Sequence, residues 1–355
     1  MDRAVTALTN VTERFSFDLP RSLEASEPPE ARGRSRDDVR MLVSYQSSET
    51  LVSSTFRDLP SFLEPGDLVV INTSATIPAA IDAVGDDGTA LVVHLSTRLD
   101  DDRWVVEPRR VAGRTTERWT GSPPSRQLTV RGGGHATLDE PYGTGARLWV
   151  ASLDVAQPVL TWLETHGRPI RYGYVDRTWP IETYQNVYAT EPGSAEMPSA
   201  GRPFTRAMIT RLIAAGVDVA PLVLHTGVAS LEADEVPYPE RFTVPATTAG
   251  RVNATRRAGH RILAVGTTVV RALESSIGAD GDAHPSDGWT DLVISSDTGV
   301  RLVDGVVTGW HEPVSSHLMM LEALIGRELL VDSYHAALVQ GYRWHEFGDL
   351  HLILP

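Results

Sequence analysis

Short runs of β-branched and apolar residues fill the chain between residues 39 and 149, and turn-forming Gly, Asp and Pro residues separate them. The runs occupy 39–45, 49–56, 67–72, 89–95, 103–108 and 147–151. Such runs are typical of β-strands, and convincing helical spacing is missing from 66–149. The pattern predicts a small antiparallel barrel or sandwich, in which the glycine-rich stretch 131–135 is a hairpin tip.

After residue 153 the apolar spacing becomes that of helices alternating with buried strands. Helical spacing marks 158–166, 205–215, 247–258, 267–276 and 315–325. Continuous apolar runs predict buried strands at 217–225, 262–265 and 292–295. This alternation indicates an α/β layer. Gly201, Gly216, Gly227 and Gly266 mark predicted strand ends, which is where α/β folds usually bind ligands.

Composition narrows the classes of protein. The 355 residues carry a formal net charge of −14 and include neither Cys nor Lys, so every basic residue is Arg. This excludes thiolate chemistry, a Schiff-base lysine and a P-loop lysine. No apolar run approaches the roughly 20 residues that span a bilayer, and the N-terminal residues lack a signal-peptide core, so we expect a soluble, cytoplasmic protein. The negative charge argues against non-specific nucleic-acid binding and suits a cationic small ligand.

Standard catalytic motifs are missing, so polar clusters at predicted strand–helix junctions are the candidates. In the stretch 198–205, Thr205 is placed to cap the following helix, either as a plain capping loop or beside amides that bind a carboxylate or phosphate. His225 and Gly227 end a buried strand. An imidazole there is either a core residue or a proton acceptor.

A third cluster opens the predicted helix at 267–276. Thr267 and Thr268 follow the end of a strand, and Arg271 and Glu274 lie three residues apart on one helical face, where they could pair. The alternative is a capped helix with a surface ion pair.

Two aromatic loops complete the candidates. The stretch 308–317 places Trp310 and His311 before a helix, as an adenine- or sulfonium-binding loop would. The stretch 342–349 is rich in aromatic and charged residues. An ordinary loop with a packed aromatic is the alternative for both.

Several stretches in order resemble one family over nearly the whole chain. They are FDLP at 17–20, PGDLVVIN at 65–72, YQNVYA at 184–189, PSAGRPFT at 198–205, AVGTTVVRALE at 264–274, WHEP at 310–313 and YRWHEFGD at 342–349. Together they resemble the S-adenosylmethionine:tRNA ribosyltransferase-isomerase (QueA) family of queuosine biosynthesis. The resemblance implies the α/β class, with a barrel-like α/β domain at 1–64 and 151–355 and an inserted small antiparallel β-barrel domain at 65–150.

The resemblance also implies a reaction. The family transfers and isomerises the ribosyl group of S-adenosylmethionine onto 7-aminomethyl-7-deazaguanine in tRNA. This forms epoxyqueuosine and releases adenine and methionine, and no metal is expected. The chemistry needs a base for the C5′ proton beside the sulfonium, donors for the departing adenine and a cavity that excludes water.

Departures from the family pattern fall on polar positions. Arg202 and Pro203 stand where the family has Leu-His, so an imidazole is lost. Ala75 and Ala80 replace arginines, and Glu235 and Tyr238 replace histidines. Three hypotheses follow: a tRNA-modifying transferase, a paralogue that uses S-adenosylmethionine or a related nucleoside with a small acceptor and no tRNA, and a non-catalytic binding protein.

The candidate residues are assigned from these clusters and the resemblance. The predicted catalytic residues are His225, His311, Thr267 and Thr268, with either histidine as the proton acceptor. The predicted substrate-binding residues are Tyr184, Gln185, Tyr188, Ser199, Gly201, Phe204, Thr205, Gly227, Arg271, Glu274, Pro313, Ser315 and Ser316. We expect S-adenosylmethionine as a substrate, no membrane association and a monomeric protein. We also expect these residues to converge on one cavity.

Overall fold

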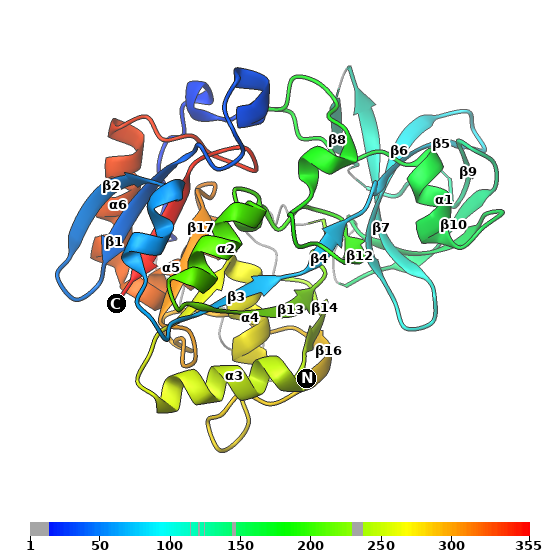
Figure 1. Ribbon diagram of the computed structural model, residues 1–355. Helices are drawn as coiled ribbons and strands as arrows, with labels where there is room; N and C mark the ends of the chain where they lie inside the picture. Colours follow the sequence, from blue (N-terminus) through cyan, green and yellow to red (C-terminus); the bar gives the residue numbers. More distant parts are fainter. Residues whose placement is uncertain (1–13, 114, 120, 124, 144–146, 229–236) are drawn as a thin grey trace.

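The structure is a computed structural model, and it describes residues 14–355 apart from 114, 120, 124, 144–146 and 229–236 (Figure 1). Within these residues the apolar runs form a nine-stranded sheet and a seven-stranded sheet, and a two-stranded pair joins β4 (Ser74–Thr76) to β12 (Glu191–Ser194). The described part of the chain contains no helix long and apolar enough to cross a bilayer.

The nine-stranded sheet is mixed and has the order β16-β14-β13-β3-β15-β17-β18-β1-β2. Its strands are β1 (Arg40–Tyr45), β2 (Thr50–Thr55), β3 (Leu68–Asn72), β13 (Asp218–Leu224), β14 (Glu240–Val244), β15 (Ile262–Val265), β16 (Ser286–Thr290), β17 (Gly305–Gly309) and β18 (Leu350–Leu354). The neighbours β13, β3, β15 and β17 run parallel, so their carboxyl ends meet at one edge. Ligands of open α/β sheets bind at such an edge.

Helices cover both faces of this sheet, which explains why its central strands are apolar throughout. The covering elements are η4 (Phe56–Phe62), α2 (Arg206–Ala214), α3 (Ala246–Arg257), α4 (Thr267–Ser275), α5 (Ser316–Ile325) and α6 (Arg327–Val339). In β3, Leu68 and Val70 pack into the core beneath α3 to α6, while Val69 and Ile71 pack against α2 and η4.

Six strands of the seven-stranded sheet close into a barrel, because β11 pairs with β7 as well as with β10, and β8 pairs with β7 outside this ring. The strands of this sheet are β5 (Ala80–Gly85), β6 (Ala90–Arg98), β7 (Trp104–Ala112), β8 (Thr115–Arg118), β9 (Gln127–Val130), β10 (His135–Pro141) and β11 (Trp149–Asp154). Helix α1 (Val159–His166) shares its core through Trp162 and Leu163. Figure 1 shows the barrel at one end of the molecule, beside the large sheet.

The predicted α/β class with a small antiparallel barrel is confirmed, and residues 131–135 form the tight β9–β10 connection. Two details differ from expectation. The span 65–150 was assigned to the insert, yet β3 lies in the large sheet and the barrel begins at β5. The predicted strand at 292–295 is wrong: this stretch pairs with no strand among the described residues, and the Leu292 carbonyl accepts a hydrogen bond from Arg271.

A buried ion pair joins the start of β3 to the start of β15. Asp67 is 1% exposed and accepts hydrogen bonds from the Arg261 guanidinium and from the backbone amides of Glu64 and Arg261. Burial alone would raise the pKa of Asp67, but these hydrogen bonds outweigh it and hold the pKa below its ordinary value.

Replacing Asp67 with Asn is expected to lower the free energy of unfolding by about 1.5–3 kcal/mol at neutral pH. Since the folded pKa lies below the unfolded one, this stabilisation is present above the unfolded pKa and disappears as pH falls through the folded pKa. Urea titrations at pH 7 and pH 3 measure both effects. Asp218→Asn, at an exposed pair with Arg251, is the control, and equal losses in the two variants would contradict the assignment.

Candidate active site

A cavity of about 320 Å³ lies at the carboxyl ends of the parallel strands, where the barrel meets the large sheet. Ser96 and Thr97 of β6 contribute from the barrel, and the segments after β13, β15 and β17 contribute Gly227, Gly266 and His311. Its volume is in the range of small-molecule sites, which is roughly 300–1,000 Å³. The cavity therefore has the position and size of a ligand site.

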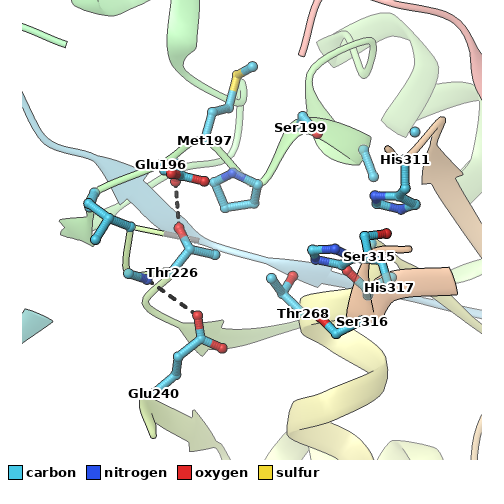
Figure 2. Close-up of a pocket in the computed structure, with 18 of the residues that line it drawn as sticks. Glu196, Met197, Ser199, Thr226, Glu240, Thr268, His311, Ser315, Ser316 and His317 are labelled. Carbon is cyan, nitrogen blue, oxygen red and sulfur yellow. Dashed lines mark hydrogen bonds between the residues drawn. The ribbon is translucent and has the colours of Figure 1, made fainter. Parts of the chain in front are cut away.

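Two stacked imidazoles form one wall of the cavity (Figure 2). The rings of His311 and His317 lie 4.4 Å apart, centroid to centroid, and are parallel within 3°. Burial, with weaker repulsion from His317 and other histidines, holds the pKa of His311 well below its ordinary value. Burial and the charge of Arg271 lower the pKa of His317 to about 4. Both rings are therefore uncharged at neutral pH.

The orientation of His311 is fixed by its neighbours. Its Nε2 lies 2.8 Å from the Thr308 hydroxyl on β17, and its backbone amide donates to the Tyr334 hydroxyl at 3.3 Å. Its carbonyl accepts from Trp344 at 3.0 Å. Because one ring nitrogen is bonded to Thr308, the other is left to act on a ligand.

Arg271 also lines the cavity and is held by several partners. Its Nη1 donates to Glu240 at 2.5 Å, and its other nitrogens donate to the carbonyls of Tyr238, Thr290 and Leu292. Glu240 in turn accepts from the Gly227 amide at 3.3 Å (Figure 2). Burial raises the pKa of Glu240, against the lowering effect of Arg271. The guanidinium therefore ties β14, β16 and the wall after β13 together.

The suggested pairing of Arg271 with Glu274 is wrong. The Glu274 carboxylate accepts hydrogen bonds from the backbone amides of Arg301, Leu302 and Val303 at 2.8–3.2 Å. It anchors the segment before β17 instead of binding the guanidinium. The two side chains lie three positions apart on α4, but each bonds a different partner.

The wall of the cavity is acidic. Among its described residues it has four carboxylates, from Glu196, Glu240, Glu312 and Glu346, against the single guanidinium of Arg271. The stacked imidazoles add no positive charge at neutral pH. Electrostatic complementarity therefore favours a ligand with net positive charge.

Many of the predicted site residues line this cavity together. They are Tyr184, Ser199, Gly227, Thr267, Thr268, Arg271, His311, Ser315 and Ser316. Thr267 and Thr268 open α4, whose first turn has no side-chain cap, after Gly266 at a φ of 93° that only glycine adopts easily. In Figure 2, Thr268, Ser315 and Ser316 lie beside the imidazoles.

Other predicted residues lie outside the cavity wall. His225 accepts from or donates to the Ser74 hydroxyl at 2.7 Å, and burial, with Arg241 nearby, lowers its pKa to about 4. Its ring does not line the cavity, so Thr267 and His311 converge there as expected and His225 does not. Thr205 caps α2 by accepting from the Met208 amide.

The remaining predicted residues also lie outside the cavity wall. Gln185 bonds the backbone of Thr76, and Phe204 packs in the core against Phe56 and Tyr188. Gly201 leaves room for Tyr188, because a Cβ there would meet its hydroxyl. The residues in this set are Gln185, Tyr188, Gly201, Phe204, Glu274 and Pro313.

Sequence reasoning missed several residues that line the cavity. His317 was part of a noted stretch, and its place six residues after His311, across a helix start, was the available signal. Thr308 and Glu346 also lay in noted stretches, whereas Tyr174 comes from a segment that only the fold brings to the cavity. Among the described residues, no group of three His, Asp or Glu side chains is placed to hold a metal ion. Glu235 lies outside the described residues.

The fold and the cavity define an α/β protein with an inserted β-barrel and a polar small-molecule site between the two. The chain belongs to the queuosine biosynthesis protein family, whose pattern matches residues 12–353. The resemblance read from the motifs is thereby confirmed.

Relatives match the chain over nearly its full length. Proteins of Symbiobacterium thermophilum and Moorella thermoacetica, both named S-adenosylmethionine:tRNA ribosyltransferase-isomerase, are 36% and 35% identical to it over 96% of this chain and 98% and 99% of their own. A crystal structure of S-adenosylmethionine tRNA ribosyltransferase from Thermotoga maritima matches with a TM-score of 0.54 and 29% identity, over 96% of this chain and 99% of that one.

Proposed function

We propose that this protein is an S-adenosylmethionine:tRNA ribosyltransferase-isomerase. It would transfer and isomerise the ribosyl group of S-adenosylmethionine onto 7-aminomethyl-7-deazaguanine in tRNA, releasing adenine and methionine. The proposal is supported by family membership and by relatives of that name. Such an enzyme would work in the cytoplasm, and we expect a monomer.

The observation that carries the proposal is the pair of uncharged imidazoles in an acidic cavity. S-adenosylmethionine carries a sulfonium and an ammonium against one carboxylate, so its net charge is positive. An acidic wall attracts this donor, and neutral rings do not repel its sulfonium. A protonated histidine pair in the same place would oppose binding.

His311 is the residue best placed to take the C5′ proton. In the tautomer whose Nε2–H donates to Thr308, Nδ1 keeps the lone pair that a base needs. The C5′–H bond would break towards Nδ1, and the electron pair left on C5′ would be stabilised by the adjacent sulfonium. We place the pocket for the acceptor base on the Tyr184 side of the cavity.

The proposal is tested by incubating the protein with S-adenosylmethionine and tRNA that carries the aminomethyl base. We expect stoichiometric release of adenine and methionine and the appearance of epoxyqueuosine in the tRNA. The control is the same tRNA with guanine at that position, which should give no product. Failure to modify the tRNA, with S-adenosylmethionine left intact, would reject the proposal.

Thr308→Val is expected to reduce kcat about tenfold, which corresponds to about 1.4 kcal/mol of transition-state stabilisation. The valine removes the hydroxyl that bonds Nε2 and holds the His311 ring in place, while KM for S-adenosylmethionine should change little. Thr308→Ser keeps the hydroxyl and should restore most of kcat. Equal kcat losses in the two variants would mean that Thr308 acts through packing instead of through the hydrogen bond.

A further inference from the structure

The end of the cavity around Tyr174 and Glu346 is not used by the proton transfer described above. Tyr174 donates to a Glu346 carboxylate oxygen at 2.7 Å, and its ring stacks on His345 at 3.8 Å between centroids and 9° between planes. His345 Nδ1 lies 3.9 Å from Glu312. Tyr174, His345, Glu312 and Glu346 therefore form one connected wall. The carboxylates of Glu312 and Glu346 both line the cavity.

The fifth group is Tyr184, whose hydroxyl is unsatisfied. Tyr184 is 3% exposed and lines the cavity, and its hydroxyl has no hydrogen-bond partner among the residues that the structure describes. Its ring lies 5.4 Å from Phe347, and it is close enough to Glu346 for the two to interact electrostatically. A buried hydroxyl without a partner costs stability, so its presence on the wall indicates a ligand that supplies one.

The backbone at this end is held in an uncommon conformation. His345 has a φ of 71°, in the left-handed region that residues other than glycine rarely adopt. This turn places the imidazole on Tyr174 and directs the chain so that the next residue, Glu346, reaches the cavity. Such conformations are found where the surrounding structure needs a side chain in one position.

We infer that Glu312, Glu346 and the Tyr184 hydroxyl form a subsite for a primary ammonium group of a substrate. An ammonium has three N–H donors, which suit two carboxylates and a hydroxyl oxygen. The only arginine on the described cavity wall, Arg271, is engaged by Glu240 and three carbonyls, so it does not neutralise these carboxylates.

This inference rests on the proposed function, under which two ammonium groups enter the site. One belongs to the amino-acid chain of S-adenosylmethionine, and the other is the aminomethyl group of the acceptor base. The shared chemistry is the same, and binding experiments separate the two sources.

Glu346→Gln and Glu312→Gln are compared with the wild type by calorimetry and by steady-state kinetics. The probes are S-adenosylmethionine, 5′-deoxy-5′-(dimethylsulfonio)adenosine (which keeps the sulfonium and lacks the amino-acid chain) and tRNA with the aminomethyl base. If the donor's ammonium binds here, the Kd for S-adenosylmethionine rises at least tenfold in Glu346→Gln and that for the dimethylsulfonio nucleoside is unchanged. If the acceptor's ammonium binds here, only KM for the tRNA rises, again at least tenfold.

Tyr184→Phe keeps the ring and removes the hydroxyl, so it tests the subsite even if a Glu346 variant unfolds. Glu328→Gln, on the exposed start of α6, is the matched control. The subsite is overturned if all three site variants keep every Kd and KM within twofold of the wild type. A wild type that binds S-adenosylmethionine but releases no adenine overturns the proposed function, while the calorimetric comparison still decides the subsite.

Discussion

Replacing His311 with alanine is expected to slow adenine release from S-adenosylmethionine by roughly 10²–10⁴-fold, the usual contribution of a positioned base. The ring is held by Thr308 on one side and by His317 on the other, and it faces the cavity. The affinity for S-adenosylmethionine should change much less, because the wall keeps its acidic groups. Single-turnover adenine release, with calorimetry for binding, measures both quantities.

The control for His311 is His335→Ala, which removes an exposed imidazole from α6. A second check is the pH profile of kcat/KM in the wild type. Since the pKa of each stacked imidazole is lowered, the rate should show no loss from these groups near pH 6.5 and should fall only towards pH 4. A His311→Ala rate within threefold of the wild type would remove His311 as the base.

Replacing Arg271 with methionine is expected to lower the free energy of unfolding by about 3–5 kcal/mol, the typical cost of breaking a buried ion pair. The change leaves the Glu240 carboxylate buried without its partner, and three carbonyls lose their donor. Urea denaturation at pH 7 measures the loss. The site should also lose affinity for S-adenosylmethionine, because the guanidinium holds the wall after β13.

A double-mutant cycle with Glu240→Gln isolates the ion pair from the carbonyl contacts. The sum of the two single losses in unfolding free energy should exceed the loss in the double variant, because each single change leaves one buried charge unpaired. Arg251→Ala, at an exposed pair with Asp218, should cost less than about 1 kcal/mol. A stability loss for Arg271→Met no larger than that of Arg251→Ala would contradict the assigned role of Arg271.

The sequence predicted those parts of the fold that depend on local patterns. The run at 67–72 became β3, and its uniform apolar character is explained by helices on both faces of the sheet. The helix expected at 267–276 is α4 almost residue for residue. The stretch 292–295 has the same apolar character as a strand, but it pairs with no strand among the described residues. Apolar character alone does not show whether a neighbouring strand is present to pair with.

The site was harder to predict because its chemistry depends on contacts between distant segments. Arg271 could have bonded Glu274 on its own helix α4, yet its partner is Glu240 on strand β14. His225 ends a strand as the sequence indicated, but its ring packs against Ser74 and away from the cavity. Tyr174 and Glu346 are 172 positions apart, and no local spacing links them.

The central claim is that the cavity between the barrel and the large sheet binds S-adenosylmethionine beside the uncharged histidine pair. A crystal structure of the protein with S-adenosylmethionine tests this claim most directly. The predicted result is density for the nucleoside in the cavity, with its sulfonium against the His311 and His317 rings and its ribose towards Thr267 and Thr268. Density for the ligand on another face, with the cavity unchanged, would contradict the account.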